Sequence, residues 1–178
     1  MALILLRHGR PAGGEGLCYG RRDLPPGDDP AALAARLDAE LPALARIVTS
    51  PAARAAHLAD AIAARRSLTA EADPRLAEMD FGAWEGRRWA DIPRAEIDAW
   101  AGDVMEARPH GGESVAMLAA RIAPALAALA AGPRPALAVT HAGVIRAALA
   151  QAGQTGAWQA GIAFAGWVVI PAGPGAGP

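Results

Sequence analysis

Short apolar runs alternate with amphipathic stretches along most of this chain. The apolar runs predict buried strands at residues 2–6, 47–49, 68–72, 136–140 and 166–170. Between them, apolar residues at helical spacing predict helices at residues 31–45, 51–65, 115–131 and 143–152. Strands that alternate with helices in this way predict an α/β fold with a mainly parallel central sheet.

Prolines and one serine indicate where the helices should begin and end. Pro42 should end or kink the first helix, because proline lacks the backbone N–H that a helix interior needs. Ser50 followed by Pro51 predicts a second helix that is capped by the serine hydroxyl and begins at the proline. Pro124 lies within the long helix 115–131 and is expected to disturb it.

Residues 1–170 are expected to form a single domain, because a chain of 178 residues suits one hydrophobic core. The segment 74–110 differs in character, since it carries three of the five tryptophans and many charges. We interpret this segment as a lid-like insertion of loops and short helices. Residues 171–178 are a Gly/Pro tail without packing capacity.

Composition narrows the classes of function. A hydrophobic content of 53% argues against disorder, and a formal charge of −1 gives no reason to expect nucleic acid or a membrane as a partner. All 17 basic residues are arginines, so an anion site must use arginine, histidine or backbone amides. Cys18 is the only cysteine, and the apolar start is too short for a secretion signal, so we expect no disulfide and a cytoplasmic location.

Two of the predicted strands end in a histidine. The first runs into Arg7 and His8, and the fourth runs into His141. Ligands of open α/β sheets bind where the carboxyl ends of the strands meet, so these side chains should lie together. Arg54, in the first turn of helix 51–65, adds a guanidinium fork at a helix N-terminus, which suits a phosphate. His57 and His110 follow no strand and are expected to be packed or surface residues.

This group of side chains could transfer a phosphoryl group. Neighbouring cations should lower the pKa of His8, which leaves a neutral imidazole nitrogen able to attack phosphorus. His141 would then be a positively charged partner of the phosphate oxygens. A leaving alkoxide needs a proton donor, and one carboxylate-rich block offers Glu78, Asp80 and Glu85. Their spacing does not choose among the three.

Six short motifs follow one another along the chain. They are Arg7-His8-Gly9, Ser50-Pro51-Ala52-Ala53-Arg54-Ala55, Leu76-Ala77-Glu78, Phe81-Gly82-Ala83-Trp84-Glu85-Gly86, Gly111-Gly112-Glu113-Ser114 and His141-Ala142-Gly143. In this order they resemble the histidine phosphatase superfamily, also called phosphoglycerate mutase-like, over residues 2 to about 170. The resemblance implies a three-layer α/β/α sandwich that works without a metal and, as we read it, without any other cofactor.

The resemblance also implies roles for individual residues. His8 would be the residue that is phosphorylated, with Arg7, Arg54 and His141 around the phosphate. Among the three carboxylates, the Leu-x-Glu motif favours Glu78 as the proton donor.

Asp80 and Glu85 are then expected to be structural, with Glu85 bonding within its own loop.

Further substrate contacts are expected from Arg10, Gly20, Arg21 and Ala142 beside Arg7 and Arg54. Relatives in this family usually continue the first motif with Glu or Gln and then Thr or Ser, whereas this chain has Arg10 and Pro11. Arg10 either contacts the phosphate or a substrate carboxylate, or points to solvent. Arg21 either reaches the substrate or is an ordinary loop arginine.

Three features resemble the α-ribazole phosphatase branch of the superfamily. They are the motif at residues 18–25, the short insertion between Glu78 and Gly111, and the Gly-Gly-Glu-Ser entry to the next helix. The tryptophans of the insertion either line a pocket for a heteroaromatic group or form the core of the lid.

The leading hypothesis is a phosphatase that hydrolyses a small-molecule phosphomonoester, with α-ribazole phosphate as a candidate, through a phosphohistidine on His8. One alternative is a phosphotransferase of the phosphoglycerate mutase type, which the short insertion disfavours. A second is a protein that binds a phosphorylated ligand without turnover. A third is a metallohydrolase that uses His8 and His141, although no local histidine–carboxylate pair accompanies them.

Overall fold

The computed structural model describes residues 3–170, so the predicted tail at 171–178 lies outside the described residues. One five-stranded sheet forms the centre, in the order β3-β2-β4-β1-β5. The strands are β1 (Leu3–Arg7), β2 (Arg46–Thr49), β3 (Ala70–Ala72), β4 (Ala136–Thr140) and β5 (Trp167–Ile170). All neighbouring pairs are parallel except β1 with β5, which confirms the predicted α/β fold with a mainly parallel sheet.

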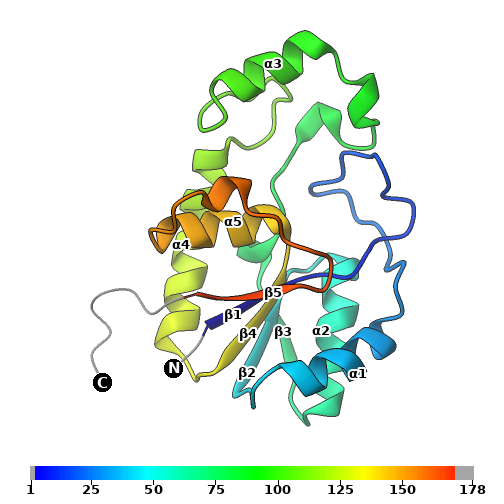
Figure 1. The fold of residues 1–178 in the computed structure, drawn as a ribbon, viewed down its shortest axis with the longest axis vertical. Coiled ribbons are helices and arrows are strands. Elements are labelled where there is room, and N and C mark those ends of the chain that lie inside the picture. The colour runs from blue at the N-terminus through cyan, green and yellow to red at the C-terminus, as the bar shows by residue number, and fades with distance from the viewer. Residues whose placement is uncertain (1–2, 171–178) are drawn as a thin grey trace.

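Helices cover both faces of the sheet (Figure 1). They are α1 (Pro30–Glu40) and α2 (Ala53–Arg65) on one face, and α4 (Val115–Ala131) and α5 (Ala142–Gln151) on the other. Side chains alternate along a strand, so Ile4 and Leu6 pack under α1 and α2, whereas Leu3 and Leu5 pack under α4 and α5. Two apolar cores therefore enclose the sheet, and the expected three-layer sandwich is confirmed.

The strand register brings the candidate residues to one edge of the sheet. Arg7 of β1 pairs with Thr140 of β4, and Thr49 of β2 pairs with Val139. The three parallel strands therefore end side by side. The residues that follow them, His8, Ser50 and His141, are delivered to the same place.

Two helices differ in detail from the prediction. α1 ends at Glu40 and not near residue 45, because Leu41 precedes Pro42 and is extended, as the residue before a proline tends to be. α4 runs unbroken through Pro124, against the expectation that the proline would disturb it. Pro124 lies on the exposed side of α4, where water can bond the carbonyl that loses its helical donor.

The segment 74–110 stands beyond the carboxyl ends of the strands, at one end of the molecule (Figure 1). It contains three short 3₁₀ turns, η1 (Pro74–Leu76), η2 (Gly82–Trp84) and η3 (Trp89–Asp91), and the helix α3 (Arg94–Gly102). Its small core contains Trp84, which is fully buried and donates its indole N–H to Glu96 at 2.6 Å.

A loop from the N-terminal part of the chain is fastened to this segment. Leu17 pairs with Arg88 as an isolated bridge, and the Cys18 N–H donates to the Arg87 carbonyl at 2.9 Å. The Glu85 carboxylate accepts from Phe81 N–H within its own loop, as expected, but also from the N–H groups of Arg21 and Arg22. Glu85 therefore joins two segments.

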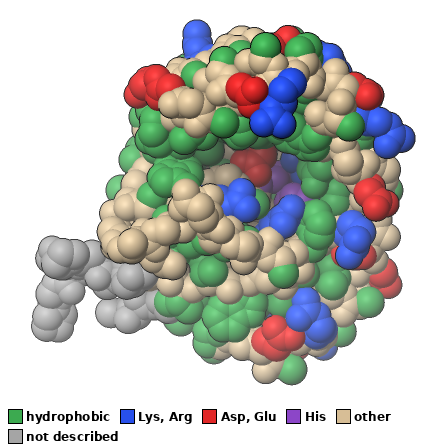
Figure 2. Space-filling view, turned by 45° about the horizontal axis from the view of Figure 1, so that its top comes forward, with side chains coloured by type: hydrophobic (Ala, Val, Ile, Leu, Met, Phe, Trp, Pro, Cys, Tyr) green, Lys and Arg blue, Asp and Glu red, His purple; other side chains and the backbone are tan. Residues whose placement is uncertain are grey.

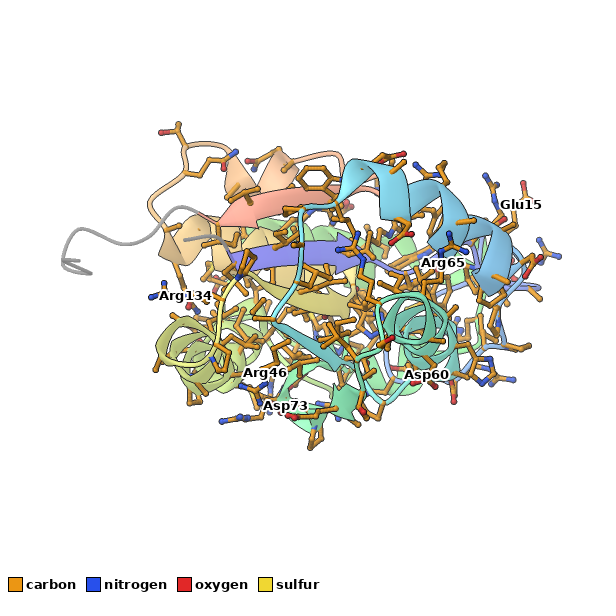
Figure 3. All side chains as sticks on the ribbon, turned by 90° about the horizontal axis from the view of Figure 1, so that it is seen from below. Glu15, Arg46, Asp60, Arg65, Asp73 and Arg134 are labelled. Atoms are coloured by element: carbon orange, nitrogen blue, oxygen red, sulfur yellow. The ribbon has the colours of Figure 1, made fainter. Side chains whose placement is uncertain are left out.

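Charged side chains lie mostly on the outside of the layers. Seen from below, Arg46, Asp60, Arg65, Asp73 and Arg134 surround the sheet and helices (Figure 3).

Within residues 3–170, no helix is both long enough and apolar enough to span a bilayer. One short 3₁₀ turn, η4 (Ala157–Gln159), connects α5 towards β5.

Candidate active site

A hollow of about 300 Å³ opens at the carboxyl ends of β1 and β4. Figure 2 shows this face, with histidine and carboxylate atoms deep in a recess and arginines at its rim. The hollow is lined by Arg7, His8, Leu17, Tyr19, Gly20, Glu78, Phe81, Trp89 and Arg146. Three candidate catalytic residues, Arg7, His8 and Glu78, therefore face one concavity.

His8 is a buried imidazole whose tautomer is fixed by the backbone. Its Nδ1 lies 2.6 Å from the carbonyl oxygen of Gly9, which can only accept, so Nδ1 carries the proton. Nε2 keeps its lone pair and accepts from Arg54 Nε at 3.3 Å. Burial, and then the Arg54 and Arg7 charges, lower the pKa of His8 to about 3. The sequence prediction of a free base stands, although burial and not the neighbouring cations is the main cause.

Arg54 connects the two histidines. It is 2% exposed, and its guanidinium donates to the carbonyls of Gly20 at 2.9 Å and Arg22 at 3.0 Å. The same group reaches His8 on one side and Nδ1 of His141 at 3.4 Å on the other. The backbone of the 19–22 loop therefore fixes this cation between the imidazoles.

His141 is buried and has the opposite tautomer. Arginine can only donate, so Nδ1 of His141 accepts from Arg54, and Nε2–H donates to the Ser50 hydroxyl at 2.7 Å. Complete burial, followed by the charge of Arg54 and, more weakly, that of Arg7, holds its pKa well below the usual value. Without a bound anion, the imidazole of His141 therefore favours its neutral form, and the positive charge expected beside a phosphate stays a prediction. An anion between the rings would raise this pKa, because an opposite charge favours the imidazolium.

Ser50 also corrects the prediction for the second helix. α2 begins at Ala53 after Ala52, which makes no side-chain cap, so Ser50 is not the N-cap and Pro51 is not the first helical residue. The serine hydroxyl is engaged by His141, 91 positions away in the chain. Arg54 still lies in the first turn of α2, as predicted.

Arg7 is held by the loop that leads into β5. Its Nη1 donates to the carbonyl of Ile162 at 2.5 Å, and its guanidinium carbon lies 3.8 Å from the centre of the Phe164 ring. The same ring lies 5.7 Å from the His8 ring. Stacking and the carbonyl bond thus fix the plane of the guanidinium beside His8.

Glu78 lines the hollow of His8 from the start of the lid segment, just after η1. Its Oε2 accepts from the N–H of Gly143 at 3.1 Å, and its Oε1 accepts from Met79 N–H at 3.0 Å. A Cβ atom on Gly143 would lie only 2.3 Å from Oε1, so glycine is required for this approach. Asp80 and Glu85 do not line the hollow and instead accept from backbone N–H groups of loops. The structure thus favours Glu78 among the three carboxylates.

The expected substrate contacts are divided among neighbouring hollows. Gly20 lines the hollow of His8, whereas Arg10 is exposed and lines an adjacent one of about 580 Å³. Arg21 donates to the Glu78 carbonyl at 3.0 Å and to Glu113, and lines a third hollow of about 370 Å³ that also reaches Glu78. Ala142 lines a fourth, apolar hollow. These roles remain predictions.

Four residues near the site escaped the sequence analysis. Ser50 was assigned to helix capping, Tyr19 entered only as part of the motif at residues 18–25, and Phe164 and Arg146 were not considered. Arg146 lies one turn after His141 on α5, and its Nε donates to the Ala160 carbonyl at 2.9 Å. Its position on the α5 face that carries Gly143 was the one available signal.

His57 is exposed and His110 is buried against Trp84. Among the side chains described for residues 3–170, no group of three potential ligands is arranged to hold a metal ion.

Comparison with known proteins adds a family to this geometry. The family model of the histidine phosphatase superfamily (branch 1) matches residues 3–174. A curated relative, glucosyl-3-phosphoglycerate phosphatase of Mycobacterium tuberculosis, is 37% identical in an alignment of 115 residues, and the match covers 57% of this chain and 51% of that protein. The match thus spans about half the length of this curated relative.

Solved structures extend the likeness to almost the whole chain. A mycobacterial glucosyl-3-phosphoglycerate phosphatase complexed with VO3 superposes with a TM-score of 0.79 and 32% identity, over 94% of this chain and 91% of that one. An α-ribazole phosphatase of Shigella flexneri superposes with a TM-score of 0.84 and 27% identity, over 98% of this chain and 92% of that one.

Proposed function

Because this chain belongs to the histidine phosphatase superfamily, we propose that it hydrolyses small-molecule phosphomonoesters through a phosphohistidine on His8. The observation that carries this proposal is the state of His8. Its Nε2 carries no proton and directs its lone pair at the Arg54 Nε–H, 3.3 Å away, and the side chain lines the hollow. A neutral imidazole in that setting is a nucleophile for phosphorus.

In the first step, Nε2 of His8 attacks phosphorus in line with the ester oxygen. The Nε2–P bond forms as the P–O bond breaks, and the imidazole keeps its Nδ1 proton on the Gly9 carbonyl. The departing oxygen takes the electron pair and receives a proton from Glu78, which lines the same hollow. The products are an alcohol and a phosphoimidazolium.

Charge on the transferred group is met by groups that are already in place. Arg54 and Arg7 present guanidinium forks whose orientations are fixed by backbone carbonyls. His141 gains a proton more easily when the dianion is bound, and it can then donate from Nδ1. As phosphorus approaches, the Arg54 Nε–H leaves the His8 lone pair and donates to a phosphate oxygen instead, while the other guanidinium nitrogens keep their backbone partners.

In the second step, the Glu78 carboxylate takes a proton from water, which attacks phosphorus. The Nε2–P bond breaks, its electron pair returns to His8, and inorganic phosphate leaves. The positive charge of the phosphoimidazolium makes His8 a good leaving group. Each group is restored to its initial state, so the cycle is balanced without another reactant.

The proposal also concerns which phosphate ester is the natural substrate. The names of the relatives make α-ribazole phosphate and glucosyl-3-phosphoglycerate the first candidates to assay. We also propose that the enzyme acts in the cytoplasm, where the buried thiol of Cys18 stays reduced.

Two substitutions test the proposed steps. Glu78→Gln is expected to lower kcat/KM for an alkyl phosphate by about 10²–10⁴-fold, and to affect p-nitrophenyl phosphate far less, because nitrophenolate leaves without a proton.

His8→Asn should abolish both turnover and acid-labile labelling by a phosphoryl donor. His57→Asn, on the exposed side of α2, is the matched control and should retain both. Equal losses for the two esters would point to another proton donor, and full activity of His8→Asn would refute the mechanism.

A further inference from the structure

A second hollow, of about 170 Å³, adjoins the phosphate site. It shares Glu78, Phe81 and Arg146 with the hollow of His8. Its walls come from four parts of the chain, namely the lid segment with α3, the start of α4, the start of α5 and η4. Figure 1 shows α3 at one end of the molecule, beyond α4 and α5.

The walls of this second hollow are apolar. Its two charged lining residues, Glu78 and Arg146, are the ones shared with the phosphate site. The side chains that form its interior are Met79, Phe81, Trp100, Val104, Leu118 and Trp158. The hollow thus has polar groups on the side of the reacting atoms and three aromatic side chains around the rest.

The size of the hollow limits what can enter it. A cavity of about 150 Å³ with aliphatic and aromatic walls binds benzene, so a hollow of about 170 Å³ accommodates one six-membered ring. A sugar of the same size would lose its water and find few hydrogen-bond partners among these walls. The walls therefore favour an apolar ring over a polyol.

On the basis of the phosphatase activity proposed above, we infer that the preferred substrate has an apolar ring one or two carbons from the ester oxygen. The phosphate lies between the arginines and His8, and the ester oxygen lies at Glu78, which borders both hollows. The ring then fills the second hollow. Benzyl phosphate is the simplest ester with this shape.

A polar leaving group would have a different place to go. The hollow of about 370 Å³ beside Arg21 and Asp23 also reaches Glu78 and carries charges of both signs. It shares Gly20 and Glu78 with the hollow of His8, so it gives a polar leaving group a second direction. A preference for polyol phosphates would therefore assign the leaving group to the charged hollow and overturn the inference.

The test compares benzyl phosphate with glycerol 1-phosphate in the full-length protein. Both are alkyl esters that need a proton on the leaving oxygen, so they differ mainly in the ring. We expect kcat/KM to be at least about tenfold higher for benzyl phosphate, as for a well-buried ring. Val104→Trp, which narrows the apolar hollow, should lower the ratio of the two kcat/KM values at least about fivefold.

A neighbouring position supplies the control. Met105 is as exposed as Val104, at 37% against 38%, but does not line the hollow, so Met105→Trp should leave the ratio unchanged. A wild-type ratio near or below one, or equal effects of the two tryptophans, would overturn the inference while leaving the phosphatase intact. No phosphate release from either ester would contradict the proposed function itself.

Discussion

At the scale of single residues, the two histidines hold opposite tautomers because each has a partner that acts in only one way. The Gly9 carbonyl can only accept, which leaves Nε2 of His8 with a lone pair. The Arg54 guanidinium can only donate, which leaves Nδ1 of His141 as an acceptor. Neither assignment depends on a titration. The two rings therefore leave opposite nitrogens unprotonated, Nε2 in His8 and Nδ1 in His141, as the proposed reaction requires.

Gly143 allows a sharp test of how Glu78 is positioned. A methyl group at this position would meet Oε1 of Glu78 at 2.3 Å, so Gly143→Ala should push the carboxyl group away from the leaving oxygen. Because the residue lies in the first turn of α5, alanine itself is acceptable to the backbone. We expect kcat/KM for an alkyl phosphate to fall about 10–100-fold, as for a displaced catalytic group.

The same variant should be compared on two esters and in a stability assay. p-Nitrophenyl phosphate should lose much less activity than the alkyl ester, because its leaving group needs no proton. Gly102→Ala, at the end of α3 with open space around the added Cβ, is the control and should behave as wild type. An alkyl phosphate activity that survives Gly143→Ala would show that the observed position of Glu78 is not the catalytic one.

At the scale of elements, the sequence predicts most of what local pattern determines. The apolar runs that form strands and the position of Arg7, His8 and His141 at strand ends are properties of short segments, and the structure agrees with them. The N-terminus of α2 could not be predicted, because the Ser50 hydroxyl is bound by a residue 91 positions away. The stacking of Phe164 on Arg7 likewise depends on how β5 returns beside β1.

Helix α4 carries the clearest disagreement between local preference and tertiary structure. Val115, Leu118, Ile122, Ala125 and Leu129 form its buried stripe. Burial of that stripe keeps the helix continuous even though a proline interrupts its hydrogen bonds. The expected break at Pro124 was therefore wrong because packing of the opposite side outweighs the loss of one hydrogen bond.

Replacement of this proline should make the protein more stable. Pro124→Ala restores a backbone donor and removes a ring that crowds the preceding turn, while the unfolded chain gains some freedom. The free energy of unfolding should rise by about 1–2 kcal/mol, measured by urea denaturation. Ala127→Gly, also on the exposed side of α4, is the control and should lower it by about 1 kcal/mol. A Pro124→Ala variant no more stable than wild type would mean that α4 has adapted fully to the proline.

At the scale of the whole molecule, the site is assembled at the expense of stability in acid. The sheet and lid bury His8 and His141 beside Arg54, and burial with these charges lowers the pKa of both imidazoles. The unfolded chain binds these protons below about pH 6.5, whereas the folded protein binds one at His8 only near pH 3. Above about pH 6.5 neither state binds these protons, so the free energy of unfolding is not reduced. As the pH drops towards 3, the unfolded chain takes up protons that the folded protein does not, and the free energy of unfolding falls.

His8→Asn should therefore make folding less sensitive to acid. Between pH 7 and pH 5, the wild type should lose about 1–2 kcal/mol more of its free energy of unfolding than this variant does, because one fewer proton is taken up on unfolding. His141→Asn should act in the same direction, although it also loses the bond to Ser50. Urea denaturation at several pH values measures the slopes.

The exposed His57 supplies the control, since His57→Asn should keep the wild-type slope. The window above pH 5 matters, because Asp73 and Glu113 have lowered pKa values and add their own loss in stronger acid. His110, whose pKa is also lowered by burial, contributes equally to the wild type and to these variants. Parallel slopes for wild type and His8→Asn would mean that His8 binds a proton in the folded protein at ordinary acidity, which removes the neutral nucleophile on which the proposed reaction depends.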